Sequence, residues 1–196
     1  MGCTCLCTFH TDGTDIYRKS SSPVPKLIID TDMDFDVDDV GAICAAHAMA
    51  DRGEVEIIAI VHNVGYPTAI GAVSVLNYFY GRDQIALGAF KGHFGAEKSG
   101  PYIDDLVENF DSPIKHYDQV TDAVQVLREA LAAAEDQSVV ISSVGFLTNI
   151  AELLSSPGDS VSPKTGYDLV RDKVQFSLSY STMAVVGSTT FDFDFR

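Results

Sequence analysis

Positive charge is scarce in this sequence. Its 196 residues include 13 lysines and arginines against 28 aspartates and glutamates, which gives a formal net charge of −15. A surface of this sign has little with which to neutralise phosphate groups, so the composition argues against nucleic acid and acidic membranes as partners. It suits a protein that handles neutral or cationic small molecules, or one that binds a divalent metal.

Cysteine is absent from most of the chain. Three of the four cysteines, Cys3, Cys5 and Cys7, lie in the first seven residues, and Cys44 lies in an apolar helical pattern. This distribution is not that of a disulfide framework. Clustered thiols can bind a metal, but no histidine or cysteine pair at ligand spacing accompanies these three. The role of the cluster stays open.

Long hydrophobic runs are also missing. No apolar run approaches the length that spans a membrane, and the N-terminus lacks the charged and apolar regions of a secretory signal. The first residues resemble an acylation signal at Gly2 and Cys3, but Leu6 stands where the myristoylation pattern has serine or threonine. We therefore expect residues 1–25 to form a flexible tail, and we expect a cytoplasmic protein.

Strands and helices are predicted to alternate after this tail. Short apolar runs predict buried strands, and helical periodicity lies between them. This pattern predicts one α/β domain over residues 26–196, with an open, mostly parallel sheet, helices on both faces and a Rossmann-like core. The expected strands are 26–30, 54–62, 85–90, 138–144 and 174–180, and the expected helices are 40–53, 68–80, 121–134, 145–154 and 167–171.

Two connections have features of their own. The segment 91–116 is rich in glycine and proline, which predicts a long loop of the kind that forms a lid or a binding loop. The helix expected from Val40 should be capped by Asp38 or Asp39, whose side chains can accept hydrogen bonds from the first turn.

An aspartate-rich loop follows the first predicted strand. The stretch LIIDTDMDFDVDD, residues 27–39, has six aspartates among its last ten residues. In parallel sheets, ligands bind outside the carboxyl ends of the strands, which is where this loop must lie. Crowded carboxylates raise one another's pKa, and a divalent cation relieves the repulsion. Oxygen ligands favour Ca²⁺ or Mg²⁺ over zinc. The alternative is a solvated acidic loop with one or two helix caps.

Two known metal-binding patterns fit this loop poorly. An EF-hand that starts at Asp32 would need glycine at Val37 and glutamate at Ile43, so that pattern fails. A phosphotransferase of the haloacid dehalogenase type begins with two aspartates that match Asp30 and Asp32, but Asp34 stands where that family has threonine or valine. An Mg²⁺-dependent phosphotransferase stays as the less favoured alternative.

A third pattern fits better. The sequence resembles the inosine–uridine-preferring nucleoside hydrolases, whose first strand runs into DTDPGxDDA. Asp30-Thr31-Asp32 and Asp38-Asp39 match this motif, and Val40-Gly41-Ala42 follows it. The family also has a Gly-Pro-Leu-(Thr/Ser)-Asn-(Ile/Leu)-Ala turn, which is similar to GFLTNIA at residues 145–151. The resemblance extends over residues 26–180.

The resemblance implies a function and a set of site residues. It implies Ca²⁺-dependent hydrolysis of the N-glycosidic bond of ribonucleosides to base and ribose, in purine or pyrimidine nucleoside catabolism. Asp32 would bind Ca²⁺ and act as the general base. Asp39 and the backbone carbonyl of Val144 would be further Ca²⁺ ligands. Asp38 would hold the ribose hydroxyls, and Asn63 would contact the ribose.

Other candidates come from positions where the pattern is less regular. His62 ends the second predicted strand, so it is either a substrate contact or a histidine satisfied within the core. The family has Pro-Gly-x where this chain has Met33–Val37, and Asp34 or Asp36 is therefore a candidate for an extra ligand position.

The family also supplies a late histidine–aspartate pair. This sequence ends at Arg196 without one, so we expect a chain that is incomplete at its C-terminus. Catalytic competence is then open, and an inactive relative that binds ribose or Ca²⁺ is the alternative function. The base preference is not determined by these residues. The oligomeric state is open as well, with a homo-oligomer as one option.

Overall fold

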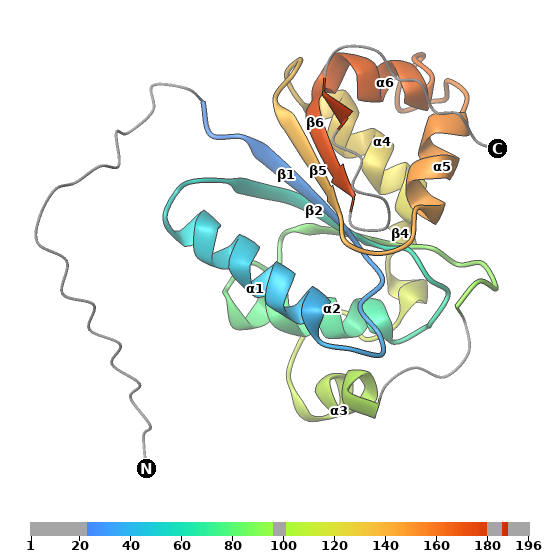
Figure 1. The fold of residues 1–196 in the computed structure, drawn as a ribbon. Helices are drawn as coiled ribbons and strands as arrows, with labels where there is room; N and C mark the ends of the chain where they lie inside the picture. The colour runs from blue at the N-terminus through green and yellow to red at the C-terminus, as the bar shows by residue number, and fades with distance from the viewer. Residues whose placement is uncertain (1–22, 96–100, 180–185, 188–196) are drawn as a thin grey trace, which may run out of the picture.

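The fold was analysed in a computed structural model, which describes residues 23–95, 101–179 and 186–187 (Figure 1). The prediction of a tail over residues 1–25, the acylation signal and the first three cysteines therefore fall almost wholly outside the described residues. The strands are β1 (Lys26–Thr31), β2 (Glu56–His62), β3 (Ala86–Ala89), β4 (Thr121–Asp122), β5 (Val139–Ser143), β6 (Val174–Ser179) and β7 (Val186–Gly187). The helices are α1 (Asp38–Asp51), α2 (Ala69–Phe79), α3 (Pro101–Asn109), α4 (Ala123–Ala133), α5 (Thr148–Ser155) and α6 (Gly166–Lys173), with a short 3₁₀ helix at Tyr117–Gln119.

The strands form one open sheet in the order β4-β3-β2-β1-β5-β6-β7. The first six run parallel to their neighbours, and β7 pairs antiparallel with β6. This confirms the predicted mostly parallel α/β sheet. The chain moves outward from β1 to β4 and then returns to place β5 on the other side of β1. Such a reversal of strand order leaves a crevice at the carboxyl ends of the two central strands, where ligands bind.

Helices cover both faces of the sheet, as predicted (Figure 1). Side chains of β1 alternate between them, because successive residues of a strand point to opposite faces. Leu27 and Ile29 pack into a core with buried residues of α1, α2 and α3, which we call the α1–α3 side. Ile28 packs into a second core with α4, α5 and α6, the α4–α6 side. None of the described helices is both long enough and apolar enough to cross a membrane.

The segment 91–116 differs from its prediction as a loop, because it contains α3. The glycines and prolines that suggested a loop lie mostly outside the helix, and Pro101 occupies its first position, where a missing N–H has no cost. Ile103 is fully buried and Leu106 is partly buried in the core of the α1–α3 side. The helix was missed because its apolar stripe is short and its flanks are rich in helix-breaking residues.

The start of α1 also differs from expectation. Its N-cap residue is Val37, whose side chain accepts no hydrogen bond, and Asp38 and Asp39 lie in the first helical turn. The prediction that one of these aspartates caps the helix was therefore wrong. Both still place negative charge at the positive end of the helix dipole, which stabilises the turn. Gly53, at φ +69°, follows the end of the helix, and its left-handed backbone conformation favours glycine there.

Candidate functional site

Three parallel strands end at the same level. Thr31 of β1 pairs with His62 of β2, and Asp30 pairs with Ser143 of β5. The connections that follow these strands therefore start from one edge of the sheet. The aspartate loop and the turn after β5 leave from the two strands between which the strand order reverses. The two sequence motifs thus lie at the crevice expected for this type of sheet.

The buried side chain of Asp30 connects these strand ends through hydrogen bonds. Its carboxylate is fully buried and accepts hydrogen bonds from Ser143 Oγ (3.0 Å) and Asn149 Nδ2 (2.9 Å). The same Asn149 nitrogen also lies 3.1 Å from the carbonyl oxygen of His62. Burial raises the pKa of Asp30 to about 7, against the lowering effect of these hydrogen bonds. Asp30 and Asn149 therefore connect β1, β2, β5 and α5, a role that sequence reasoning did not assign although both residues belong to its motifs.

Asp32 lies directly against the turn that follows β5. A Cβ atom at Gly145 would stand 2.4 Å from both Cγ and Oδ1 of Asp32, a separation that side chains do not tolerate. Glycine at this position is what allows the half-buried carboxylate of Asp32 to occupy its place. Burial raises the pKa of Asp32, and the neighbouring carboxylates of Asp38 and Asp36 raise it further. The two motifs are therefore in direct contact.

Three further aspartates form a compact acidic group. Asp36, Asp38 and Asp39 each offer a carboxylate oxygen, and these atoms lie within 4.8 Å of one another. Asp39 is buried and accepts a hydrogen bond from Thr31 Oγ1. Burial raises the pKa of Asp39 to about 7, with further contributions from the charges of Asp32, Asp38 and Asp36. The structure therefore brings Asp36 into the group and places Asp38 there too, where the sequence predicted a ribose contact.

The donor chemistry of this group fits a divalent cation. In the described part of the chain, no lysine or arginine forms an ion pair with Asp32, Asp36, Asp38 or Asp39. Several carboxylate oxygens at one place are the ligands that Ca²⁺ and Mg²⁺ take. Val144, whose carbonyl is the remaining predicted ligand, donates its N–H to the carbonyl oxygen of Asp30 (2.8 Å). This holds Val144 beside the end of β1, and its carbonyl stays a predicted ligand.

Asn63 is buried with one unsatisfied polar atom. Its Nδ2 donates to the carbonyl oxygen of Phe146 (2.8 Å), and its own carbonyl accepts from Thr148 Oγ1 (2.6 Å). Its Oδ1 has no hydrogen-bond partner among the described residues. Buried acceptors are rarely left unpaired, so this atom is available to a donor that the protein itself does not supply.

The ring of His62 lies inside the core, where backbone carbonyls lie beside its nitrogens. Its ring is fully buried, with Nδ1 3.0 Å from the carbonyl oxygen of Val64 and Nε2 3.2 Å from that of Met33. Burial lowers the pKa of His62 to about 4, so the ring is neutral at physiological pH and donates to one of the two carbonyls. This geometry supports the alternative of a histidine satisfied within the core, and the substrate contact stays a prediction that it does not favour.

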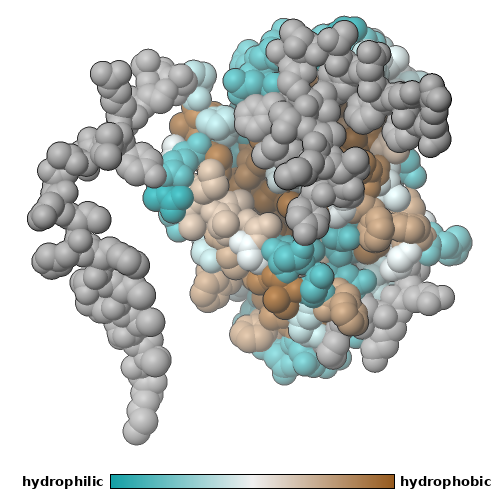
Figure 2. Space-filling view, in the orientation of Figure 1, coloured by the Kyte–Doolittle hydropathy of each residue, from teal (hydrophilic) through white to brown (hydrophobic). Residues whose placement is uncertain are grey.

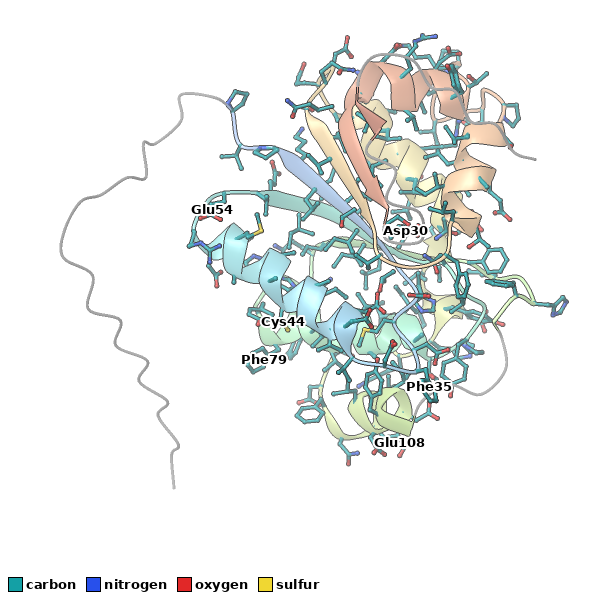
Figure 3. All side chains as sticks on the ribbon, viewed as in Figure 1. Asp30, Phe35, Cys44, Glu54, Phe79 and Glu108 are labelled. Atoms are coloured by element: carbon teal, nitrogen blue, oxygen red, sulfur yellow. The ribbon has the colours of Figure 1, made fainter. Side chains whose placement is uncertain are left out.

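Exposed aromatic rings lie in the loops at this edge of the sheet. Phe94 and Phe146 meet edge to face with their centroids 4.8 Å apart, and each is about half exposed. Phe35, in the aspartate loop, is 81% exposed. Figure 3 shows Asp30 between the strand ends and Phe35 farther out, near α3. Sequence reasoning missed the Phe94–Phe146 pair, and the only signal for it was phenylalanine at the motif's proline position.

Solved structures with a similar fold were found, although no sequence relative was. The sequence matches no protein-family model and no curated protein. Among solved structures, the type III effector protein XopQ in complex with adenosine diphosphate ribose has a TM-score of 0.62 at 18% identity, over 79% of this chain and 42% of that one. The effector protein XOO4466 has the same TM-score and identity, over 79% of this chain and 43% of that one. The plant nucleoside hydrolase PpNRh1 has a TM-score of 0.50 at 24% identity, over 76% and 57%.

These similarities confirm the expected fold. The sheet and its helices have the arrangement of nucleoside hydrolase structures, as the two sequence motifs indicated. The chain spans about half the length of the solved structures that it matches. At identities below 25%, this likeness concerns the fold, and activity has to be argued from the site.

Proposed function

We propose that this chain hydrolyses the N-glycosidic bond of ribonucleosides, releasing base and ribose, with Ca²⁺ bound at the acidic group. The observation that carries the proposal is the contact between Asp32 and Gly145, which joins the two motifs into one site where the strand order reverses. The fold shared with a plant nucleoside hydrolase supports it. Nucleoside breakdown in a cytoplasmic setting follows from the same proposal.

The metal would be held by the carboxylates of Asp32, Asp36, Asp38 and Asp39, together with the carbonyl of Val144. A bound divalent cation lowers the pKa of a coordinated water and orients it for attack. The raised pKa of Asp39 supports this assignment, because its buried charge lacks a compensating cation among the described side chains.

Asp32 would accept the proton of the attacking water. It is half-buried and lies beside the acidic group, where a water held by the metal would stand. Cleavage of a glycosidic bond develops positive charge on the sugar, and negative carboxylates around the sugar stabilise that charge. The unpaired Oδ1 of Asn63 would accept a hydrogen bond from a ribose hydroxyl.

One observation favours a second candidate, which is binding of a ribose-containing ligand without hydrolysis. The fold matches XopQ, whose structure contains adenosine diphosphate ribose, with a higher TM-score than the plant hydrolase. Asp38 belongs to the acidic group in this chain, so one carboxylate is shared between the metal role and the predicted ribose role.

Base release from inosine and uridine, measured with and without Ca²⁺, tests the proposal. Turnover should require Ca²⁺, and Asp32→Asn should lower it at least about 10³-fold, because the general base and a metal ligand are lost together. Asp83→Asn is the matched control, since this exposed aspartate follows α2 outside the site.

Other outcomes would contradict hydrolysis. Calorimetric binding of adenosine diphosphate ribose without base release from any nucleoside would favour the second candidate. Phosphate release from a phosphomonoester with Mg²⁺ would instead favour the phosphotransferase alternative. Absence of all three activities would overturn the proposal.

A further inference from the structure

A groove runs between three helices on the α1–α3 side. It consists of two adjoining hollows of about 550 and 630 Å³, and both are lined by Leu76, Leu106 and Phe110. We call it the α1–α3 groove. Its remaining lining residues are Val37, Val40, Cys44, Val75, Tyr78, Phe79, Tyr80, Tyr102, Asp105, Asn109 and Asp111. None of the proposed Ca²⁺ ligands lines it, but one end of the groove adjoins the acidic loop through Val37 and Tyr102.

Large apolar side chains around this groove are open to solvent. Phe79 is 80% exposed, Val37 65%, Phe110 57% and Tyr78 50%. Figure 3 shows Cys44 and Phe79 on the same part of the molecule, and Figure 2 shows mainly apolar and weakly polar residues over α1. These side chains give the groove an apolar rim, and apolar hollows with a polar border are found at sites of association.

The helices that form the groove carry charge of one sign. α1, α2 and α3 contain no lysine and no arginine, and their acidic residues are Asp38, Asp39, Asp51, Asp104, Asp105 and Glu108. Asp105 and Asp111 line the groove, and Glu108 is exposed on α3 (Figure 3). The groove is therefore apolar with an acidic border.

Two cationic side chains close to these helices already form hydrogen bonds or an ion pair within the protein. Lys115 Nζ lies 2.8 Å from the carbonyl oxygen of Val107 and 2.6 Å from that of Phe110, at the end of α3. Arg82 donates to Asp51 at 2.5 Å, at the end of α1. Neither side chain forms an ion pair with Asp105 or Asp111. Lys115 places one positive charge at the Phe110 end of the groove, and the three carboxylates of Asp105, Glu108 and Asp111 outnumber it.

We propose that the α1–α3 groove binds a cationic amphipathic helix of a partner protein. A groove between helices accepts the apolar face of another helix, whose side chains at i, i+3 or i+4, and i+7 enter it. Lysines or arginines that flank this apolar face would lie against Asp105, Glu108 and Asp111. A second copy of this chain fits less well, because its own acidic helices would meet the same acidic border and its net charge is also −15.

Binding of a designed peptide to the full chain tests the proposal. The probe is a labelled leucine–lysine helix of about 18 residues, five helical turns, and the matched control peptide has glutamate in place of lysine. Fluorescence anisotropy should show binding of the leucine–lysine peptide and none of the leucine–glutamate peptide.

Variants of the protein locate the binding surface. Phe79→Ser combined with Phe110→Ser should weaken binding at least about tenfold, because exposed aromatic anchors are lost. Asp105→Lys combined with Asp111→Lys should weaken it to a similar extent by reversing the charge of the border. Glu129→Lys combined with Glu152→Lys, both exposed on the α4–α6 side, should leave the affinity within about twofold. Circular dichroism of each variant checks that it is folded.

Three results would overturn the proposal. Equal weakening by the Glu129 and Glu152 variant would show that the peptide responds only to the net charge of the protein. Failure of the leucine–lysine peptide to bind would show that the groove does not accept such a helix. A dimer in light scattering that Phe79→Ser converts to a monomer would show that a second copy occupies the groove.

Discussion

The two sides of the sheet differ in how their outer segments are held against the helices. On the α4–α6 side, a buried arginine connects α4 to the turn-rich segment before α6. Arg128 is 2% exposed, and its guanidinium donates to Asp159 (2.8 and 3.0 Å), to Ser156 Oγ (2.9 Å) and to the carbonyls of Ser162 (3.1 Å) and Lys164 (3.0 Å). The segment is thereby held against α4, and only a smaller hollow of about 310 Å³ is described beside it.

The α1–α3 side has no comparable connection in the described residues. Its outermost helix, α3, is joined to the rest by Tyr66 and Thr68, which donate to Asp104. The α1–α3 groove remains open beside it. The acidic loop lies next to α1, and Tyr102 of α3 donates to the carbonyl of Asp36 (2.6 Å). The candidate site therefore adjoins the α1–α3 side, which has the larger hollows.

Removal of the buried arginine should have the largest effect on stability. Arg128→Met deletes the guanidinium donors to the segment 156–164 and leaves the carboxylate of Asp159 without its cation. We therefore expect a loss of about 3 kcal/mol in the free energy of unfolding. Urea unfolding of both proteins measures it. The matched control is Arg171→Met, a half-exposed arginine with surface ion pairs, which should cost less than about 1 kcal/mol. Equal losses would contradict the view that Arg128 holds this side together.

Acid should weaken the α1–α3 side through its buried histidine. The pKa of His62 is about 4 in the folded protein against an ordinary 6.5, so the unfolded chain binds more protons between these values. Stability is thus lost as the pH falls from about 6.5 to 4, by of the order of 3 kcal/mol. His62→Gln removes this loss, so the difference in unfolding free energy between wild type and variant should shrink over that range.

Buried aspartates change the free energy of unfolding with pH in the opposite direction. The variant His62→Gln is needed to separate the contribution of His62 from theirs. The pKa of Asp30 is raised to about 7, so its contribution to stability is present at low pH and is lost as the pH rises through 7. Urea unfolding of wild type and His62→Gln at the same pH values cancels this common contribution. His116→Gln, at an exposed histidine, is the control, and a similar change in that variant would refute the assignment to His62.

Contact between the two motifs should control metal binding. Gly145→Ala would place a methyl group 2.4 Å from the carboxylate of Asp32, which must then move. We expect Ca²⁺ affinity to fall about 10–100-fold, as when a ligand loses its support, and calorimetry measures it. Gly41→Ala in α1 is the control, because nothing lies within 4 Å of the added Cβ. Unchanged affinity in Gly145→Ala would separate Asp32 from the metal site.

Truncation of an exposed aromatic should change stability least. Phe79 is 80% exposed at the groove, so Phe79→Ser should alter the free energy of unfolding by no more than about 0.5 kcal/mol. Thermal unfolding followed by circular dichroism measures this. A loss above about 1 kcal/mol would mean that Phe79 is packed, and the α1–α3 groove would then not be open at this point.

Much of the fold could be predicted from local patterns. Apolar runs such as the one at residues 26–30 identified the strands, because residues buried on both faces of a parallel sheet are almost all apolar. The helix at 101–109 was missed because its apolar residues are few and its flanks contain glycine and proline. The two-residue strand β4 was missed as well, since it is too short to show a pattern.

The candidate site was predicted in part. Its aspartates and the turn at Gly145 were identified by their motifs, and Asp36 was one of two candidates for an extra ligand position. The presence of Asp38 in the same group was not predicted. That grouping depends on how the loop folds back onto α1, which has no periodic signal in the chain. The buried role of Asp30 and the edge-to-face pair of Phe94 and Phe146 were missed for the same reason, because each joins segments far apart in the sequence.

The sequence by itself determined the α/β class, the order of most elements and the acidic character of the loop after β1. These properties follow from hydrophobic periodicity and composition, which are local. Only the tertiary structure decided that Asp32 meets Gly145, that Asp39 is buried with a raised pKa, and that a buried arginine holds one side of the sheet together while the other side keeps an apolar groove. Those properties depend on packing between distant segments, because burial and close approach are set by the whole fold.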